Sequence, residues 1–268
     1  MPSTIDLQAQ AVDEDGEVFY IPNFVTEEEE SYLIRKINDT PHQSWKSLAN
    51  RRLQIWGGLM TGKNVLLSQS LPPFVEVYPN VIDRLQSTGA FCASTHGAPN
   101  HIIVNEYLPG QGIMPHQDGP AYHPVVATIS LGSHTAFHYY RYRTGSPSQA
   151  ATDVFSPGPE GEARIIDHTP VMSVLLEPRS VIITSGSMYT SHLHGIGNEI
   201  VDYFTAGSDD TDPPKFADFN VAVANWRLLG RKDTKEAVIN GRFLQRSIRY
   251  SLTCRDVEKA ANSALFKR

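Results

Sequence analysis

Residues 105–119, NEYLPGQGIMPHQDG, decide the fold prediction for this chain. The apolar run 101–107 just before is typical of a strand, and the Gly- and Pro-containing segment 108–112 predicts a turn. The chain then re-enters the sheet with His116 and Asp118, two positions apart. Because side chains at i and i+2 of an extended strand project from the same face, this spacing directs an imidazole and a carboxylate to one point.

A third metal ligand is expected from residues 191–198, SHLHGIGN. His192 and His194 again lie two apart, and they follow the apolar run 180–184. Two histidines and one carboxylate form the facial triad of non-haem Fe(II) oxygenases, which leaves three positions of an octahedron open. Spacing alone does not choose between His192 and His194, because strand alternation puts both on the same face.

Two arginines near the end of the chain, Arg249 and Arg255, lie in the segment RYSLTCR. Its alternation predicts a late strand with both guanidinium groups on one face. The planar fork of arginine matches a carboxylate bidentately. An inward arginine near a two-histidine, one-carboxylate iron site therefore indicates an anchor for a dicarboxylate cosubstrate, 2-oxoglutarate.

With these residues in hand, the chain resembles the AlkB-like family of Fe(II)- and 2-oxoglutarate-dependent dioxygenases over about residues 18–256. The resemblance is specific because five motifs occur in the family's order. They are Asn-x-Tyr (Asn105, Tyr107), His-x-Asp (His116, Asp118), Ser-Leu-Gly (130–132), His-Gly-Ile (194–196) and Arg-Tyr-x-Leu-Thr-x-Arg (249–255).

The resemblance implies a role for each matching residue. The iron ligands would be His116, Asp118 and His194, with the His-Gly-Ile context favouring His194 over His192. Arg249, together with Asn105 and Tyr107, would hold the distal carboxylate of 2-oxoglutarate, and Arg255 would lie near the metal-bound end or the substrate. Dioxygen would complete the reactants, and the reaction would hydroxylate a C–H bond, with N-demethylation of DNA or RNA as the expected outcome.

The family also places a lid over the active site, supplied by the part of the chain before the core. Arg51, Arg52 and Trp56 are therefore candidate substrate contacts by resemblance. The alternative is that Trp56 packs on the core while both arginines lie in solvent. One position departs from the nucleic-acid repair members, which carry an acidic residue two positions after the metal-binding aspartate, where this chain has Pro120.

The fold expected is mainly β: a double-stranded β-helix, or jelly roll, with N-terminal helices and a lid extension. Short strands separated by turns are typical of this class, in contrast to alternating βαβ units. They are expected at 101–107, 112–118, 125–131, 134–140, 171–177, 181–184, 191–197, 219–225 and 247–253. A helix is expected after Thr26, which forms a capping box with Glu29, and a second one within 71–86 is interrupted by Pro79.

The expected organisation is a single catalytic domain with extensions. Residues 1–17 are predicted to be a mobile tail, 18–96 a helical and lid extension packed on the core, and 97–258 the jelly-roll dioxygenase domain. A flexible loop, rich in Gly, Ser and Pro, is expected at about 141–169.

The charge, the cysteines and the apolar segments of the chain indicate which partners and which cellular location to expect. The formal net charge of −6 does not indicate a nucleic-acid binder, yet residues 225–255 hold eight basic side chains. A local basic face could bind nucleic acid, or the segment could be a solvated turn and helix. The two cysteines, without CxxC spacing, support neither disulfides nor a zinc site. No membrane span or signal peptide is predicted, which indicates the cytoplasm, the nucleus or both.

Three classes of function stay open from the sequence. The first is an oxygenase acting on methylated nucleic acid, and the second is the same chemistry on a protein side chain or a small molecule, which the acidic charge and Pro120 favour. The third is a non-catalytic jelly-roll binding module. Other histidines are expected to be half-buried residues with satisfied rings rather than ligands; they are His96, His101, His123, His134 and His138. The sequence does not determine the oligomeric state.

Overall fold

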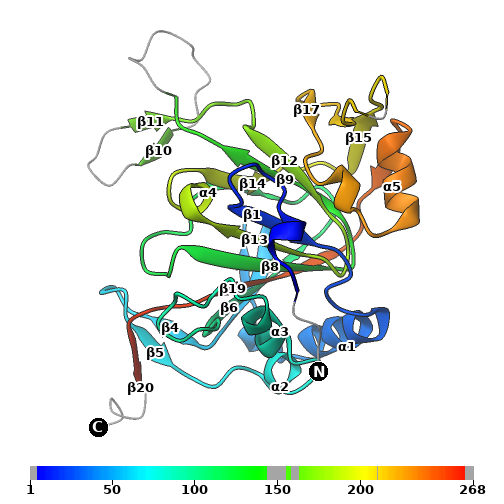
Figure 1. The fold of residues 1–268 in the computed structure, drawn as a ribbon. Coiled ribbons are helices and arrows are strands. Elements are labelled where there is room, and N and C mark those ends of the chain that lie inside the picture. Colours follow the sequence, from blue (N-terminus) through cyan, green and yellow to red (C-terminus); the bar gives the residue numbers. More distant parts are fainter. Residues whose placement is uncertain (1–4, 144–154, 158–162, 210, 263–268) are drawn as a thin grey trace.

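The computed structural model describes residues 5–143, 155–157, 163–209 and 211–262 (Figure 1). Its largest element is a seven-stranded sheet, here called the major sheet, in which neighbouring strands run antiparallel. In spatial order its strands are β1 (Val18–Ile21), β13 (Val181–Ser185), β8 (Val125–Leu131), β19 (Arg249–Arg255), β6 (His101–Tyr107), β3 (Arg51–Trp56) and β2 (Lys46–Leu48).

A four-stranded antiparallel sheet, the minor sheet, faces the major sheet. Its strands are β12 (Met172–Leu176), β9 (Thr135–Tyr140), β14 (Leu193–Ile196) and β7 (Ile113–His116). Apolar side chains from both sheets pack together between them, among them Tyr107, Phe137 and Ile182. The two facing sheets confirm the predicted jelly-roll fold.

Strand β19 shows how the sequence separates core from cavity. Its neighbours β6 and β8 flank it on both sides, so it lies in the middle of the major sheet. Leu252 and Cys254 point to the outer face of the sheet and are fully buried there. Arg249 and Arg255 point to the inner face and line a cavity between the sheets. The period of two predicted for this segment therefore puts both guanidinium groups on the same side, as expected.

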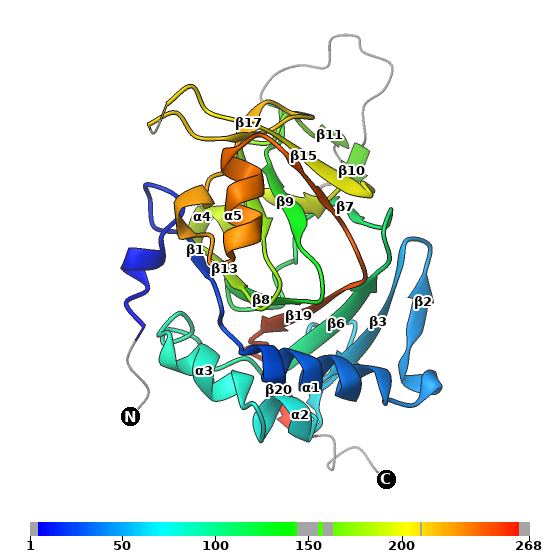
Figure 2. The same cartoon turned by 90° about the vertical axis from the view of Figure 1, so that its right-hand side faces the viewer.

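Helices cover the outer face of the major sheet, where they enclose the main apolar core (Figure 2). The first, α1 (Glu27–Asn38), begins with the predicted capping box: the Thr26 hydroxyl accepts from the Glu29 amide and the Glu29 carboxylate accepts from the Thr26 amide. Leu33 and Ile37 form its fully buried side. The second predicted helix is divided into two short ones; they are α2 (Pro73–Glu76) and α3 (Val81–Ser87).

Two expectations for the first part of the chain need correction. Segment 18–96 is not only a helical extension, because β1 and β3 form hydrogen-bonded strands of the major sheet. Residues 5–17, expected to be mobile, are ordered: the Asp13 carboxylate accepts from the amides of Glu17 and Val18. Apolar side chains in this segment also pack on the core, which fixes its position without any hydrophobic period in the sequence.

Smaller elements surround the two sheets. A four-stranded sheet next to the minor sheet contains β17 (Val221–Ala222), β16 (Lys215–Phe216), β15 (Val201–Thr205) and β18 (Phe243–Gln245), and α5 (Lys232–Ile239) packs on it. A three-stranded sheet contains β20 (Ala260–Asn262), β5 (Leu66–Ser68) and β4 (Gly58–Met60). The remaining elements are η1 (Gln8–Gln10), η2 (His42–Ser44), α4 (Gly186–Thr190), η3 (Trp226–Leu228) and the strand pair β10 (Phe155–Pro157) and β11 (Ala163–Ile165).

Most predicted strands occur, although their ends shift. The strands at 101–107 and 125–131 have the expected bounds, whereas the one at 219–225 is reduced to β17. The predicted strand 191–197 begins only at Leu193, because α4 and its cap precede it. Most of the predicted flexible loop at 141–169 lies outside the described residues, and its described part contains the antiparallel pair β10–β11.

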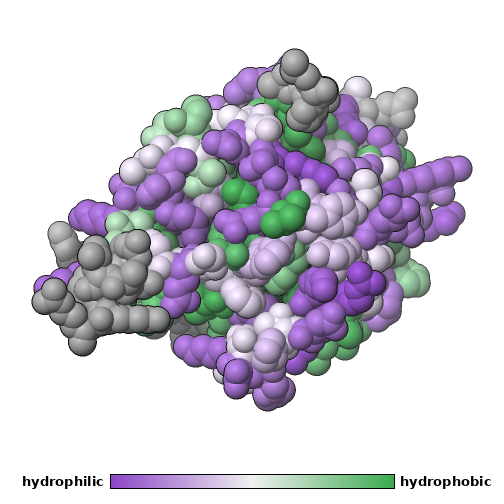
Figure 3. Space-filling model, turned by 90° about the horizontal axis from the view of Figure 1, so that it is seen from below, coloured by the Kyte–Doolittle hydropathy of each residue, from purple (hydrophilic) through white to green (hydrophobic). Residues whose placement is uncertain are grey.

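Seen from below, the face formed by α1–α3 and β4–β5 is largely hydrophilic with separate apolar patches (Figure 3). The exposed apolar side chains that these elements and their connections contribute include Leu59, Val77 and Tyr78. None of the helices in the described residues has the length and apolar character needed to cross a membrane.

A buried ion pair outside the cavity between the sheets should contribute to the stability of the folded protein. Arg246 donates to both carboxylate oxygens of Asp202, at 2.8 and 2.6 Å, and His134 Nε2 lies 3.1 Å from the same carboxylate. We expect Asp202→Asn to lower the free energy of unfolding by about 3 kcal/mol, because it removes the buried counter-charge of Arg246 and leaves only the partly exposed Glu199, 3.4 Å from its Nη2. Urea unfolding at pH 7 measures this, with the exposed Asp218→Asn as the control.

The same pair predicts how stability depends on pH. Burial raises the pKa of Asp202, but the Arg246 hydrogen bonds and charge outweigh it and lower the pKa to about 2. A carboxyl group whose pKa is depressed on folding stabilises the protein above its unfolded pKa of about 4, and that stability is lost as the pH falls through the folded pKa. Between pH 4 and 2 the parent should therefore lose more stability than Asp202→Asn. Equal losses of stability in the parent and in Asp202→Asn would show that a depressed pKa of Asp202 is not the cause.

Candidate metal centre and its cavity

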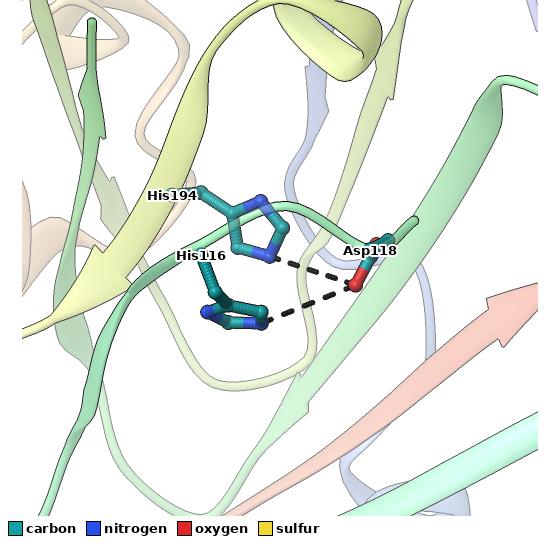
Figure 4. Close-up of side chains that lie close together, drawn as sticks. All are labelled: His116, Asp118 and His194. Atoms are coloured by element: carbon teal, nitrogen blue, oxygen red, sulfur yellow. Dashed lines mark ion pairs between the residues drawn. The ribbon is translucent and has the colours of Figure 1, made fainter. Parts of the chain in front are cut away.

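Three side chains converge between the sheets: His116, Asp118 and His194 (Figure 4). Strands β7 and β14 pair so that His116 lies directly opposite His194, and the two ring centroids are 4.5 Å apart. Asp118 follows β7 by two residues, and its Oδ1 lies 4.0 Å from His116 Nε2 and 3.9 Å from His194 Nε2. One potential ligand atom from each residue lies within 4.8 Å of the others. The structure thus brings these three predicted residues together.

Hydrogen bonding and burial prepare the two imidazoles to bind a metal. His116 Nδ1 lies 2.9 Å from the Met114 carbonyl oxygen, so Nδ1 donates and the Nε2 lone pair is directed toward Asp118. Burial lowers the pKa of His116, and it lowers that of His194 to about 3. Both rings are therefore neutral at neutral pH, the form that binds a metal ion. The ring of Phe137 stacks on His194 at 5.4 Å and restricts its rotation.

The choice between His192 and His194 depends on where the strand begins. His192 lies before β14, in the irregular segment after α4, and its Nδ1 contacts the Ser187 carbonyl oxygen at 3.1 Å. The alternation argument does not apply there, because the residue is not part of the strand. Among the described residues, His194 is the histidine that joins His116 and Asp118.

Asp118 carries a full negative charge into the cavity. Burial raises its pKa, but the Arg255 guanidinium, His194 and the hydrogen bond from Arg255 Nη2 outweigh burial and leave the pKa below its ordinary value. Its Oδ2 atom is buried without a hydrogen-bond partner. A buried carboxylate oxygen is costly when unsatisfied. Two neutral imidazoles and this carboxylate fit a divalent transition metal such as iron.

The cavity has a volume of about 210 Å³ and extends from the three potential ligands to Arg249. Arg249 is 3% exposed, and its Nη2 donates to Ser130 Oγ at 2.8 Å. Its Nε and Nη1 atoms are buried without partners. Burial lowers the pKa of Arg249 to about 10, so the group is still charged at neutral pH. Two unused donors on a buried guanidinium fit the carboxylate of a ligand.

Tyr107 and Asn105 lie on the cavity face of β6, next to Arg249. The Arg249 guanidinium lies over the Tyr107 ring, 5.5 Å from its centroid. Asn105 Oδ1 accepts from Arg51 Nε at 3.0 Å. At the opposite end of β19, Arg255 pairs with Asp118 beside the candidate metal centre. The residues expected to bind the cosubstrate thus line one continuous cavity.

The three candidate substrate contacts on β3 lie on two opposite faces of the strand, because side chains alternate along it. Arg51 lines the cavity, whereas Arg52 faces away and donates to both oxygens of Glu106 at 2.6 Å. Trp56 packs edge-on against Phe74 in the core, with 6.0 Å between ring centroids. Arg52 and Trp56 are therefore corrected from substrate contacts to structural residues. The physical reason is that positions 52 and 56 share a parity opposite to that of 51.

Two further residues at the site, one behind Arg249 and one in the cavity wall, were not predicted as site residues. Ser130 orients Arg249, and its position in the Ser-Leu-Gly motif was a signal that could have indicated it. Tyr122 lines the cavity and lies under the Arg255 guanidinium, 5.0 Å from the ring centroid. It belongs to the irregular segment after Asp118, where neither alternation nor helical period predicts which side chains point inward.

Comparison with known proteins agrees with this geometry. Residues 17–255 match the model of the 2OG-Fe(II) oxygenase superfamily. The chain belongs to that superfamily. It is an oxidoreductase whose family uses Fe(II), 2-oxoglutarate and dioxygen, and this confirms the predicted enzyme class and cofactors.

The chain is similar to two curated proteins and one solved structure named as AlkB homologues. It is 36% identical to a Danio rerio protein named Probable RNA/DNA demethylase ALKBH6, covering 98% of this chain and 95% of that one. It is 26% identical to the Arabidopsis thaliana Alkylated DNA repair protein ALKBH8 homolog, covering 69% and 52%. The structure of OsALKBH1 aligns with a TM-score of 0.46 at 15% identity, covering 90% and 96%. The first of these relatives confirms the AlkB-like family.

The predicted basic face is smaller than the sequence suggested. Three of its eight members, Arg246, Arg249 and Arg255, are buried and point into the fold. The other five belong to or flank η3, α5 and β18; they are Arg227, Arg231, Lys232, Lys235 and Arg242.

Proposed function

We propose that this oxygenase removes N-methyl groups from nucleic acid, with His116, Asp118 and His194 as the iron ligands. The observation that carries the proposal is a single cavity with a two-histidine, one-carboxylate cluster at one end and a buried, half-satisfied arginine at the other. Bound iron with 2-oxoglutarate and dioxygen supplies the oxidation of the substrate C–H bond. Hydroxylation of an N-methyl carbon gives a product that releases formaldehyde.

The protein's own residues place the reactants. Arg249 would fix the distal carboxylate of 2-oxoglutarate through the two donors it does not otherwise use, and Ser130 keeps its guanidinium from turning away. The pair with Arg255 keeps the Asp118 carboxylate ionised and oriented. Phe137 and the apolar cluster behind it exclude water from one side of His194.

Nucleic acid is the substrate class that the relatives' names support, one as an RNA/DNA demethylase and one as an alkylated DNA repair protein. The buried cavity requires the target group to leave any base stack before it can react, so a single-stranded or flipped base is expected. We propose that the exposed basic residues around α5 contact the phosphates. An intracellular location, in the cytoplasm, the nucleus or both, stays a prediction.

A binding and turnover experiment tests the proposal. Iron-loaded protein with 2-oxoglutarate should release formaldehyde and succinate from single-stranded oligonucleotides that carry an N-methylated base. Its affinity for them should fall with salt, because phosphate contacts release counterions. The double variant Lys232→Gln/Arg242→Gln, which changes two exposed residues, should bind more weakly and with a shallower salt slope. The double variant Arg35→Gln/Lys63→Gln, at two exposed positions outside the α5 region, is the charge-matched control.

Succinate formation without formaldehyde from any oligonucleotide, together with salt-insensitive binding, would contradict the nucleic-acid substrate. Absence of succinate from folded, iron-loaded protein would contradict the site assignment itself. The two failures are distinct, because the first leaves cosubstrate turnover intact.

A further inference from the structure

The charges that line the cavity are unequal in sign. Three guanidinium groups reach it, from Arg51, Arg249 and Arg255, against one carboxylate, that of Asp118, among the described residues. An imidazole that binds a metal is neutral. A divalent iron ion and doubly negative 2-oxoglutarate cancel one another, so the loaded cavity keeps an excess of two positive charges.

The guanidinium groups differ in what neutralises them. Arg255 is paired with Asp118, and Arg249 has the donors for a cosubstrate carboxylate. Arg51 donates from Nε to the neutral amide oxygen of Asn105 at 3.0 Å, and no carboxylate among the described residues pairs with it. Its charge therefore faces whatever enters the cavity.

Among the described residues that line the cavity, Asp118 is the one acidic side chain, so none is left to compensate Arg51. The segment after Asp118 presents the uncharged Tyr122 to the cavity, and Pro120, which has neither a charge nor a hydrogen-bond donor, is exposed. Adenine methylated at N1, or cytosine methylated at N3, carries a positive charge at neutral pH, whereas either base methylated on its exocyclic amine stays neutral. The positive charge of Arg51 would repel the cationic base as it enters the cavity, and it would not repel the neutral base.

We propose that the cavity selects an uncharged N-methylated base over a cationic one, and that Arg51 is the residue that sets this preference. The inference rests on the proposed function, since it names the class of base that the same site takes. It makes Arg51 a specificity-determining residue, distinct from the arginines that serve the iron ligand and the cosubstrate.

Equilibrium binding tests the inference without turnover. The probes are short single-stranded oligonucleotides, identical except for one N6-methyladenine, one 1-methyladenine or one adenine. The protein carries Mn(II) and an unreactive dicarboxylate analogue of 2-oxoglutarate, and fluorescence anisotropy gives the affinities. The parent should bind the N6-methyladenine probe roughly tenfold more tightly than the 1-methyladenine probe, a ratio expected for one like-charge contact in a partly buried site. Arg51→Gln should narrow the ratio to within about threefold, and Arg35→Gln should leave it unchanged.

Equal or tighter binding of the 1-methyladenine probe by the parent would overturn the inference while leaving the proposed function intact. An unchanged ratio in Arg51→Gln would overturn the role of Arg51. Failure of every probe to bind, with iron-dependent succinate formation retained, would contradict the nucleic-acid substrate and the inference with it. Thermal unfolding of Arg51→Gln checks that the variant is folded, which the neutral partner of Arg51 leads us to expect.

Discussion

Asp118→Asn is expected to reduce succinate formation by more than about a hundredfold. Loss of groups that merely orient a metal ligand commonly costs 10- to 100-fold in metal affinity or activity, and loss of a ligand should cost more. The substitution keeps the size of the side chain but removes the single cavity-lining carboxylate among the described residues. Anaerobic titration should show that the absorption band of the iron and keto-acid complex is lost together with turnover.

The same substitution should also weaken the folded protein. Arg255 is 6% exposed and would keep a neutral partner in place of its counter-charge. We therefore expect the metal-free variant to unfold with a free energy lower by about 3 kcal/mol, as for other broken buried ion pairs. Urea unfolding measures this separately from activity.

His192→Ala is the matched control for the metal site, because strand spacing by itself did not separate His192 from His194. The structure puts it outside β14 and in contact with the Ser187 carbonyl. The His192→Ala variant should retain both the absorption band of the iron and keto-acid complex and the formation of succinate. Loss of iron in His192→Ala, or its retention in Asp118→Asn, would show that the ligands are assigned wrongly.

Periodicity predicted the part of the site that lies on regular strands. Alternation predicted that Arg249 and Arg255 share one face of β19, and the family resemblance added Asn105 and Tyr107. In the structure all four line one cavity. The pairing of β7 with β14 could not be predicted in the same way. It joins segments far apart in the sequence, so its register depends on tertiary packing.

The failures occurred where regular structure ends. The short helix α4 delays the start of β14 by two residues, and nothing in SHLHGIGN indicates this. The segment containing Arg51, Arg52 and Trp56 was treated as one lid, although it is a strand whose two faces have different roles. Had the alternation argument been applied there, it would have separated Arg51 from the other two.

Arg249→Met is expected to raise the KM for 2-oxoglutarate by roughly two to three orders of magnitude. A charge-assisted, bidentate contact with a carboxylate contributes several kcal/mol, and each 1.4 kcal/mol corresponds to a factor of ten in affinity. The iron ligands are untouched, so binding of Mn(II) or Fe(II) alone should change little. Succinate formation as a function of 2-oxoglutarate concentration measures the effect, and Arg35→Gln, at an exposed arginine of α1 outside the cavity, is the control.

The same Arg249→Met variant should be more stable than the parent, although it binds 2-oxoglutarate more weakly. In the cosubstrate-free protein the Arg249 guanidinium is buried with two donors unsatisfied, and burial lowers its pKa to about 10. The charged form is therefore less favourable in the folded than in the unfolded chain, and an apolar side chain of similar length relieves that cost. We expect a higher melting temperature for Arg249→Met than for the parent without cosubstrate, and a smaller gain on adding 2-oxoglutarate. A variant that was less stable and still bound 2-oxoglutarate normally would show that Arg249 is a structural residue, and the cosubstrate would then need another anchor.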